Sequence, residues 1–147
     1  VPRTQEYDQM NAGLASVNLP VAGKILYDAD MALYSKNKDW KKYGQLAAEN
    51  LEKYYSDNMD MLNNAAWSFY ENIKDKQMLE KALAWSNRSV QLKETSFNLD
   101  TKANLLYKLG RKEEAIATEE KALELAKRSG DRTDFLIENI ERFKKGK

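Results

Sequence analysis

The chain of 147 residues contains no cysteine and no histidine, and it has only two prolines and six glycines. The first two absences remove disulfides, thiol nucleophiles, zinc sites built from cysteine and histidine, and every catalytic triad with an imidazole base. The scarcity of proline and glycine leaves little room for the many tight turns of a β-sandwich or barrel. The sequence therefore predicts a helical protein, and we expect no metal and no cofactor.

An excess of charge is also lacking, since 24 Lys and Arg residues balance 23 Asp and Glu residues to a formal net charge of +1. This balance supplies no overall attraction for nucleic acid or anionic membranes. No apolar run approaches the roughly 18 residues of a membrane span, and no signal-peptide hydrophobic region is present. We therefore expect no nucleic-acid partner and no membrane span. The first residue is Val1, which we interpret as a removed leader or as a segment of a longer protein.

An internal repeat organises the second half of the chain. Residues Glu80–Leu92 recur 33 positions later as Glu113–Leu125, and residues 62–70 match residues 99–107 at an offset of 37. The four extra residues fall in the first connector, where loops absorb insertions at low cost. Apolar residues recur at the spacing of one buried helix face, first at Leu62, Ala65, Ala66, Phe69, Tyr70 and Ile73, and then at Leu79, Ala82, Leu83, Ser86 and Val90.

Weaker helical patterns flank the repeats. A degenerate hairpin over residues 21–58 has two expected inward faces, one of Ile25, Ala29, Ala32 and Leu33, the other of Tyr43, Leu46, Ala47, Leu51 and Tyr54. At the N-terminus Tyr7, Met10, Leu14 and Val17 predict a short helix that Asn18 and Pro20 end. At the C-terminus Leu136, Ile140 and Phe143 share one face. Repeat stacks need such terminal helices to close an otherwise open core.

The second copy resembles a tetratricopeptide repeat, because it has that family's small residue at Ala103, glycine at Gly110 and alanines at Ala115 and Ala122. It departs from the pattern after Arg128, where the usual proline is missing. The first copy, with Asn63-Asn-Ala-Ala-Trp67, is similar to a variant of the same repeat. The resemblance implies an all-α, right-handed superhelix of antiparallel helix hairpins with terminal capping helices.

On this basis we predict one domain over residues 1–147. Its predicted parts are an N-terminal capping helix (1–20), the degenerate hairpin (21–58), two repeats (59–95 and 96–130) and a C-terminal capping helix (131–147). The runs Leu62–Tyr70 and Asp100–Gly110 also resemble repeat segments that follow thioredoxin-fold domains in some bacterial envelope proteins. That resemblance implies an accessory region of a thiol-disulfide protein in the cell envelope or periplasm, with the cytoplasm as the alternative.

Paired carboxylates are the catalytic chemistry that the composition leaves open, since two suitably spaced acids hydrolyse glycosides. The candidate pairs of acids are Glu113/Glu114, Glu119/Glu120 and Asp131/Asp134. We interpret each pair as a solvated face or helix start, and therefore assign no catalytic residue. Trp85 is placed on the outer side of its helix, where we favour a packing role within the chain. We expect a binding or scaffolding module and no enzyme; self-association and a hydrolase using paired acids are the alternatives.

The family resemblance implies that the first helix of each repeat lines a concave binding face. Equivalent positions on the two first helices then form the predicted site for a protein or peptide, which includes an N-terminal domain of the same polypeptide among its candidate partners. These residues are Asn63, Asn64, Trp67, Tyr70 and Glu71 in the first repeat, and Asp100, Thr101, Asn104, Tyr107 and Lys108 in the second.

This hypothesis makes a prediction about two asparagines. Asn64→Ala and Asn104→Ala should each weaken binding of the partner while leaving the melting temperature nearly unchanged, because side-chain amides in a groove pair with a peptide backbone. Thermal unfolding and a binding assay on the same variants check both parts. Unchanged binding, or a large fall in melting temperature, would place the functional surface elsewhere.

Overall fold

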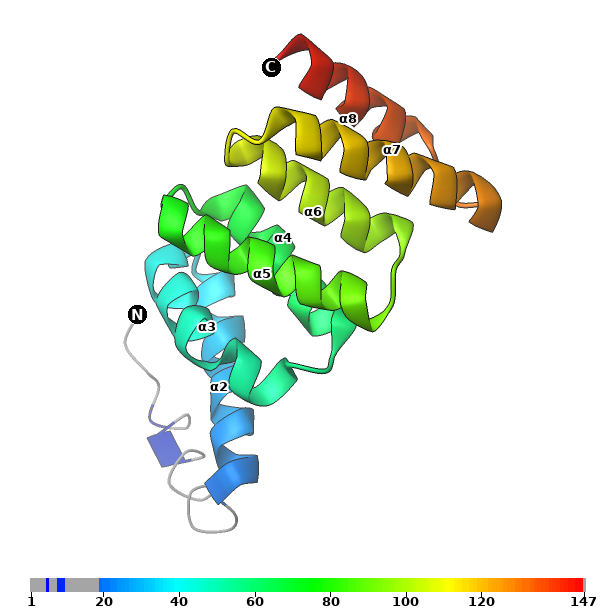
Figure 1. Ribbon diagram of the computed structural model, residues 1–147. Helices are drawn as coiled ribbons and strands as arrows, with labels where there is room; N and C mark the ends of the chain where they lie inside the picture. The colour runs from blue at the N-terminus through cyan, green and yellow to red at the C-terminus, as the bar shows by residue number, and fades with distance from the viewer. Residues whose placement is uncertain (1–4, 6–7, 10–18, 147) are drawn as a thin grey trace. The chain divides into compact units, whose positions relative to one another are not determined.

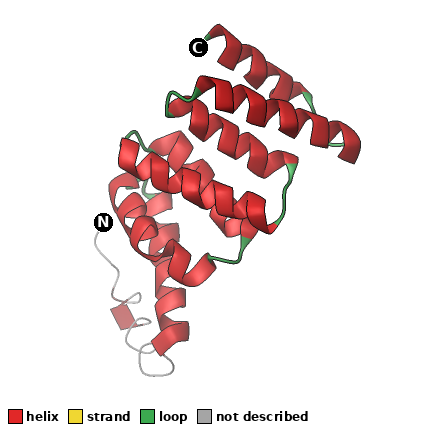
Figure 2. Ribbon diagram, in the orientation of Figure 1, coloured by secondary structure: helices red, strands yellow, loops and turns green. Residues whose placement is uncertain are grey.

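The protein is all-α. In the computed structural model, which describes residues 5, 8–9 and 19–146, no strand occurs in those residues. The long helices are α2 (Leu19–Lys36), α3 (Trp40–Tyr55), α4 (Met59–Asn72), α5 (Lys76–Leu92), α6 (Ser96–Lys108), α7 (Lys112–Ser129) and α8 (Asp134–Lys145). Figure 2 shows the short loops that join them. The expected helical class is thus confirmed.

The chain divides into two compact units, residues 1–54 and 55–147. In the first unit, a turn at residues 37–39 separates α2 from α3, and Lys38 takes a positive φ of 55° there. The Asp39 carboxylate accepts from the Lys42 backbone N–H at 3.2 Å and begins α3. Gly23 lets α3 approach closely, since a Cβ at this position would lie 2.8 Å from the Tyr54 hydroxyl oxygen.

The inward placement of two residues in the first unit was wrong. Ile25 and Ala32 are exposed, because the buried Tyr27 lies two residues, or about 200° of helix rotation, from Ile25. Pro20 lies in the first turn of α2, where its missing N–H costs nothing. The predicted capping stripe of Tyr7, Met10, Leu14 and Val17 lies outside the described residues. One domain over residues 1–147 stays a prediction.

The second unit consists of helices that turn back on one another through loops of three or four residues. Helix α4 packs against α5, α6 against α7 and α7 against α8, and α6 also contacts both α4 and α5 (Figure 1). Five alanines that recur at the predicted helix contacts are fully buried, namely Ala66, Ala82, Ala103, Ala115 and Ala122. Their small side chains let paired helices come together without a cavity.

The predicted core stripes of this unit are largely confirmed. Leu62 and Phe69 on α4, Leu99 on α6 and Leu136 on α8 are at most 2% exposed, whereas Tyr70 is only partly buried. The placement of Trp85 on an outer face was wrong, since it is 1% exposed. Its ring meets the Phe69 ring edge-on at 4.8 Å between centroids, which confirms the packing role.

A buried polar link connects the two repeats. The Ser89 hydroxyl donates to the Met59 carbonyl at 2.8 Å, and it accepts from the Asn98 side-chain amide at 3.1 Å. The same amide donates to the Lys93 carbonyl at 2.8 Å, while the Asn98 carbonyl oxygen accepts from the Thr95 N–H at 2.9 Å. Asn98 thereby caps α6 and satisfies backbone groups at the end of α5 and in the following loop.

We expect Asn98→Ala to lower the free energy of unfolding by about 2–3 kcal/mol, because it leaves buried backbone groups without partners. Urea unfolding followed by circular dichroism measures the change. Asn72→Ala is the matched control: this exposed asparagine donates one bond to the Ser68 carbonyl, and its loss should cost below about 0.5 kcal/mol. Equal losses in the two variants would contradict the structural role given to Asn98.

Candidate functional site

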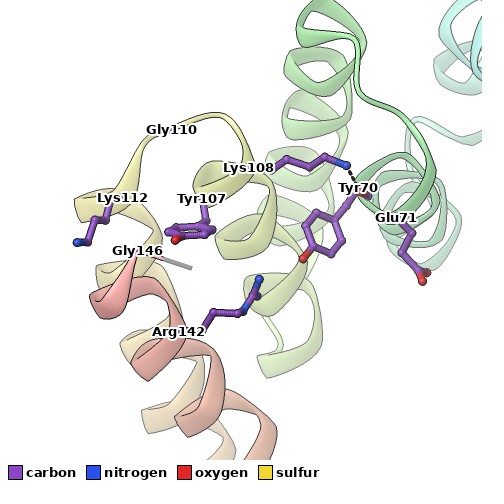
Figure 3. Close-up of a pocket in the computed structure, with 8 residues that line it drawn as sticks. All are labelled: Tyr70, Glu71, Tyr107, Lys108, Gly110, Lys112, Arg142 and Gly146. Atoms are coloured by element: carbon purple, nitrogen blue, oxygen red, sulfur yellow. Dashed lines mark hydrogen bonds between the residues drawn. The ribbon is translucent and has the colours of Figure 1, made fainter.

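A pocket of about 760 Å³ lies in the second unit. It lies where the C-terminal ends of α4, α6 and α8 meet the start of α7 (Figure 3). Its lining residues are Tyr70, Glu71, Tyr107, Lys108, Gly110, Lys112, Arg142 and Gly146. The volume lies within the range of small-molecule and peptide side-chain sites.

Two tyrosines form its aromatic walls. Tyr70 packs against Trp67 with ring centroids 4.9 Å apart, and Tyr107 stacks on the buried Phe143 ring at 4.5 Å. Both tyrosines are only partly buried, and a cation of the lining lies over each ring: Lys108 Nζ is 5.4 Å from the centre of the Tyr70 ring, and the guanidinium carbon of Arg142 is 5.7 Å from that of Tyr107. Because neighbouring side chains already hold the two rings, the tyrosines lose little side-chain entropy when a ligand packs against them.

Gly110 gives this end of the unit its shape. It has a φ of 83°, a left-handed conformation that glycine adopts without strain, and its N–H donates to the Tyr107 carbonyl at 2.9 Å. The chain therefore turns directly from the aromatic wall on α6 into the first turn of α7, where Lys112 stands. This is the turn that the sequence pattern placed at Gly110.

Three cationic side chains line the pocket, against one carboxylate. Lys108 donates to the Tyr70 carbonyl, and Lys112 donates to the Lys144 carbonyl at 3.1 Å. Burial, followed by repulsion from Lys74, lowers the pKa of Lys108. Among the described residues neither lysine forms an ion pair, so their charges are not neutralised by the protein. The carboxylate is that of Glu71, which points away from Arg142 in Figure 3.

Arg142 links the pocket to a buried polar cluster. Its guanidinium carbon lies 4.9 Å from the centre of the Phe143 ring and 5.7 Å from that of Tyr107. One terminal nitrogen donates to the side-chain oxygens of Asn104 at 2.6 Å and Asn139 at 3.1 Å. Both partners are neutral amides, and the carboxyl groups that act electrostatically on the guanidinium lie behind them.

Behind these amides lie two carboxyl groups, Asp100 on α6 and Glu119 on α7. The Asn139 amide donates to Asp100 Oδ1 at 2.9 Å and to Glu119 Oε1 at 3.0 Å. The Asn104 amide also donates to Asp100 Oδ1, at 3.0 Å. Glu119 is 0% exposed, and its Oε2 accepts no hydrogen bond within the described part of the chain.

The surroundings of Glu119 keep its carboxyl group protonated. Burial is the largest cause of the rise in the pKa of Glu119 to about 9, followed by the hydrogen bond to Asp100 and repulsion from its charge. Burial also raises the pKa of Asp100, although its hydrogen bonds and Arg142 act in the opposite direction. Glu119 thus stays protonated at neutral pH and donates to Asp100, so that one negative charge faces one positive charge from α8.

The exposed position expected for Glu119 was wrong. Its pattern could have revealed the burial: Ala115, Glu119, Ala122 and Ala126 occur at i, i+4, i+7 and i+11, and all four are 0% exposed. Glu120, the other member of the predicted pair, is exposed and pairs with Lys144 at 3.3 Å. Reasoning from the sequence also missed Arg142, which no local pattern joins to α6.

The structure brings together four of the ten predicted binding residues, Tyr70, Glu71, Tyr107 and Lys108, in the pocket. Asp100 and Asn104 belong to the polar cluster beside it. Thr101 is buried and donates to the Phe97 carbonyl at 3.2 Å. The others lie further from the pocket: Asn63 and Trp67 are partly buried, and Asn64 is exposed. Because Asn104 is 1% exposed and hydrogen-bonded, its replacement by alanine should destabilise the fold, unlike the expectation from sequence.

Comparisons with protein-family models, with curated proteins and with solved structures found no match. Within residues 19–146 and the three described before them, no helix is both long and apolar enough to cross a membrane. Over the same residues, no three His, Cys, Asp or Glu side chains are grouped so as to hold a metal ion. The site is therefore interpreted from its own geometry.

Titration of Glu119 predicts how stability changes with pH. The folded chain keeps the Glu119 proton up to a pKa of about 9, whereas the unfolded chain releases it near 4.5. Between these values the unfolded state binds fewer protons, so this group's contribution to stability is lost as pH rises, by roughly 1.4 kcal/mol per pH unit. Chemical unfolding from about pH 6 to about pH 8 measures the slope.

Glu119→Gln should remove most of that dependence, because its amide reproduces the hydrogen bonds of the protonated acid without titrating. Glu120→Gln is the matched control, and it should leave the slope of the parent chain. A slope that is the same in all three proteins would show that Glu119 is ionised in the folded chain.

Proposed function

We propose that the chain is a noncovalent binding module for a protein or peptide, built as a right-handed superhelix of tetratricopeptide-like hairpins. One observation carries this proposal: the walls of the pocket come from equivalent positions of the two repeats. Tyr70 and Glu71 correspond to Tyr107 and Lys108 at the offset of 37. Stacked repeats form binding surfaces in this way, by presenting the same helix position from successive units.

The chemistry of the walls supports a peptide ligand. Aromatic faces from Tyr70 and Tyr107 offer apolar contact, and the charged groups between them fix orientation. Catalysis would need reacting groups that a substrate reaches, and the strongest acid–base candidate, Glu119, is 0% exposed. We therefore propose binding without chemistry, with no cofactor.

The resemblance to repeat segments beside thioredoxin-fold domains supports a narrower proposal. In it the chain is an accessory region of a larger bacterial thiol-disulfide protein, and an N-terminal domain of the same polypeptide is a candidate partner. The coding sequence upstream of Val1 tests this version directly. An upstream region that encodes no folded catalytic domain would exclude it and leave the binding proposal intact.

Hydrolysis by paired acids is the second candidate, which the raised pKa of Glu119 favours. However, Asp100 and Glu119 are hydrogen-bonded to each other, whereas glycosidases separate their carboxyls by about 5–10 Å to admit the sugar and water. Self-association is a third candidate, supported by the exposed Phe97 and Ile137. Light scattering at several concentrations distinguishes an oligomer from a monomer, and an activity screen on Glu119→Gln tests the hydrolase.

Selection from a random peptide display library tests the binding proposal. We expect peptides enriched on the parent chain to lose at least about tenfold in affinity on Tyr70→Leu or Tyr107→Leu, since leucine keeps apolar volume but removes the flat ring face. Lys127→Ala, an exposed lysine on α7 outside the pocket, is the control and should retain binding. Peptides that bind all variants equally, or no enrichment at all, would contradict a peptide site in this pocket.

A further inference from the structure

The pocket and the buried carboxyl pair share one group, Arg142. On one side its guanidinium lines the pocket together with Lys108 and Lys112. On the other side it donates to Asn104 and Asn139, whose amides hold the two acids. A charge placed in the pocket therefore acts on the acids through a single side chain and two hydrogen-bonded amides.

We propose that the pocket is a proton-linked site for the carboxylate groups of an acidic peptide, in which Lys108, Lys112 and Arg142 bind the anion and the Asp100–Glu119 pair takes up a proton. The inference rests on the proposed function and adds the chemical class of the ligand and its coupling to pH. Its two parts, the anion and the proton, depend on different observations.

The charges define the anion. Lys108, Lys112 and Arg142 donate to neutral carbonyl and amide oxygens, and Glu71 is the one carboxylate in the lining. The charge of Asp100, behind the amides, offsets part of the charge of Arg142. Arg142 donates through only one of its nitrogens to the described residues, which leaves further N–H groups for a planar, bidentate partner. A carboxylate is such a partner. A bound carboxylate would replace the water molecules that otherwise solvate the three cations.

The shape and the wider surface favour a peptide over other anions. A pocket of about 760 Å³ with two tyrosine walls is much larger than an inorganic anion, which would leave both rings uncovered. A nucleic acid is disfavoured because the formal net charge is only +1, and a polyanion needs positive charge spread along its path. Acidic peptide side chains satisfy the cations, and the peptide chain covers the rings.

The proton follows from electrostatics. The charged groups that act on the pair are the two acids themselves, from α6 and α7, and Arg142 from α8. In the free protein Arg142 favours the ionised carboxyls, because opposite charges stabilise each other. A bound anion offsets that positive charge, so protonated carboxyls become more favourable. By linkage, anion binding takes up protons around the Glu119 pKa of about 9, and affinity falls as pH rises through that range.

Isothermal titration calorimetry on the whole chain tests both parts, with a blocked tetra-aspartate peptide as probe and tetra-asparagine as its neutral match. We expect tetra-aspartate to bind and tetra-asparagine to bind at least about tenfold more weakly. The double variant Lys108→Ala with Lys112→Ala should bind tetra-aspartate about tenfold more weakly than the parent chain does. Equal binding of the two peptides, or tighter binding of inorganic phosphate or of a single-stranded oligonucleotide, would overturn the assignment of the anion.

Proton uptake is measured by repeating the titration near pH 9 in two buffers of different ionisation enthalpy, where Glu119 is about half protonated. We expect uptake of a substantial fraction of a proton by the parent chain, and much less by Glu119→Gln. Asp100→Asn is the second variant, and Glu120→Gln the control that keeps the uptake. The same uptake in Glu119→Gln as in the parent would assign it to the lysines and overturn the linkage.

The two proposals fail in distinguishable ways. If display selection yields peptides that depend on Tyr70 and Tyr107 but are not acidic, the binding module stands and the acidic ligand falls. If acidic peptides bind without proton uptake, only the linkage falls. If no peptide of any composition depends on the tyrosines, the proposed function fails with both.

Discussion

The contact between the protonated Glu119 and Asp100 is the constraint around which the C-terminal half of the second unit is arranged. Glu119 belongs to α7 and Asp100 to α6, while the amide that donates to both acids, Asn139, belongs to α8. Helices α6, α7 and α8 therefore all contribute a side chain to this carboxyl pair. Without the proton on Glu119, two negative charges would lie in contact where water is excluded, and the guanidinium of Arg142 would have to offset both.

Apolar side chains surround the Glu119–Asp100 pair and make an ionised carboxyl there unfavourable. Leu99, Ala122, Ala126 and Leu136 form a buried cluster that joins the same three helices. Because the alanines allow close approach, little space remains for water to solvate the acids. The tight core and the retained proton are thus two results of the same helix spacing. The pocket lies at one end of these three helices, where Arg142 extends from the buried amides of Asn104 and Asn139 to the pocket lining.

Much of the second unit could be predicted from sequence because its signals are local. The stripe that includes Leu62 and Phe69 and the glycine after α6, Gly110, each depend on residues a few positions apart, and each is found as expected. Glu119, Trp85 and Asn104 were misplaced because long-range packing decides their burial. Whether Asn104 faces a groove or a neighbour depends on α8, whose Arg142 lies 38 positions away. Periodicity identifies a helix face but not what covers it.

The two repeats differ at the place where the acid is buried. Ser86 is the equivalent of Glu119 at the offset of 33, and it too is 0% exposed, with a hydroxyl that has no hydrogen-bond partner in the described chain. The repeats are therefore not interchangeable modules. An array made by concatenating the second hairpin would bury a carboxyl group at every junction, and only the last copy would have the arginine of α8 beside it. Anyone who builds longer arrays from this chain should propagate the first hairpin and keep the second as the terminal unit.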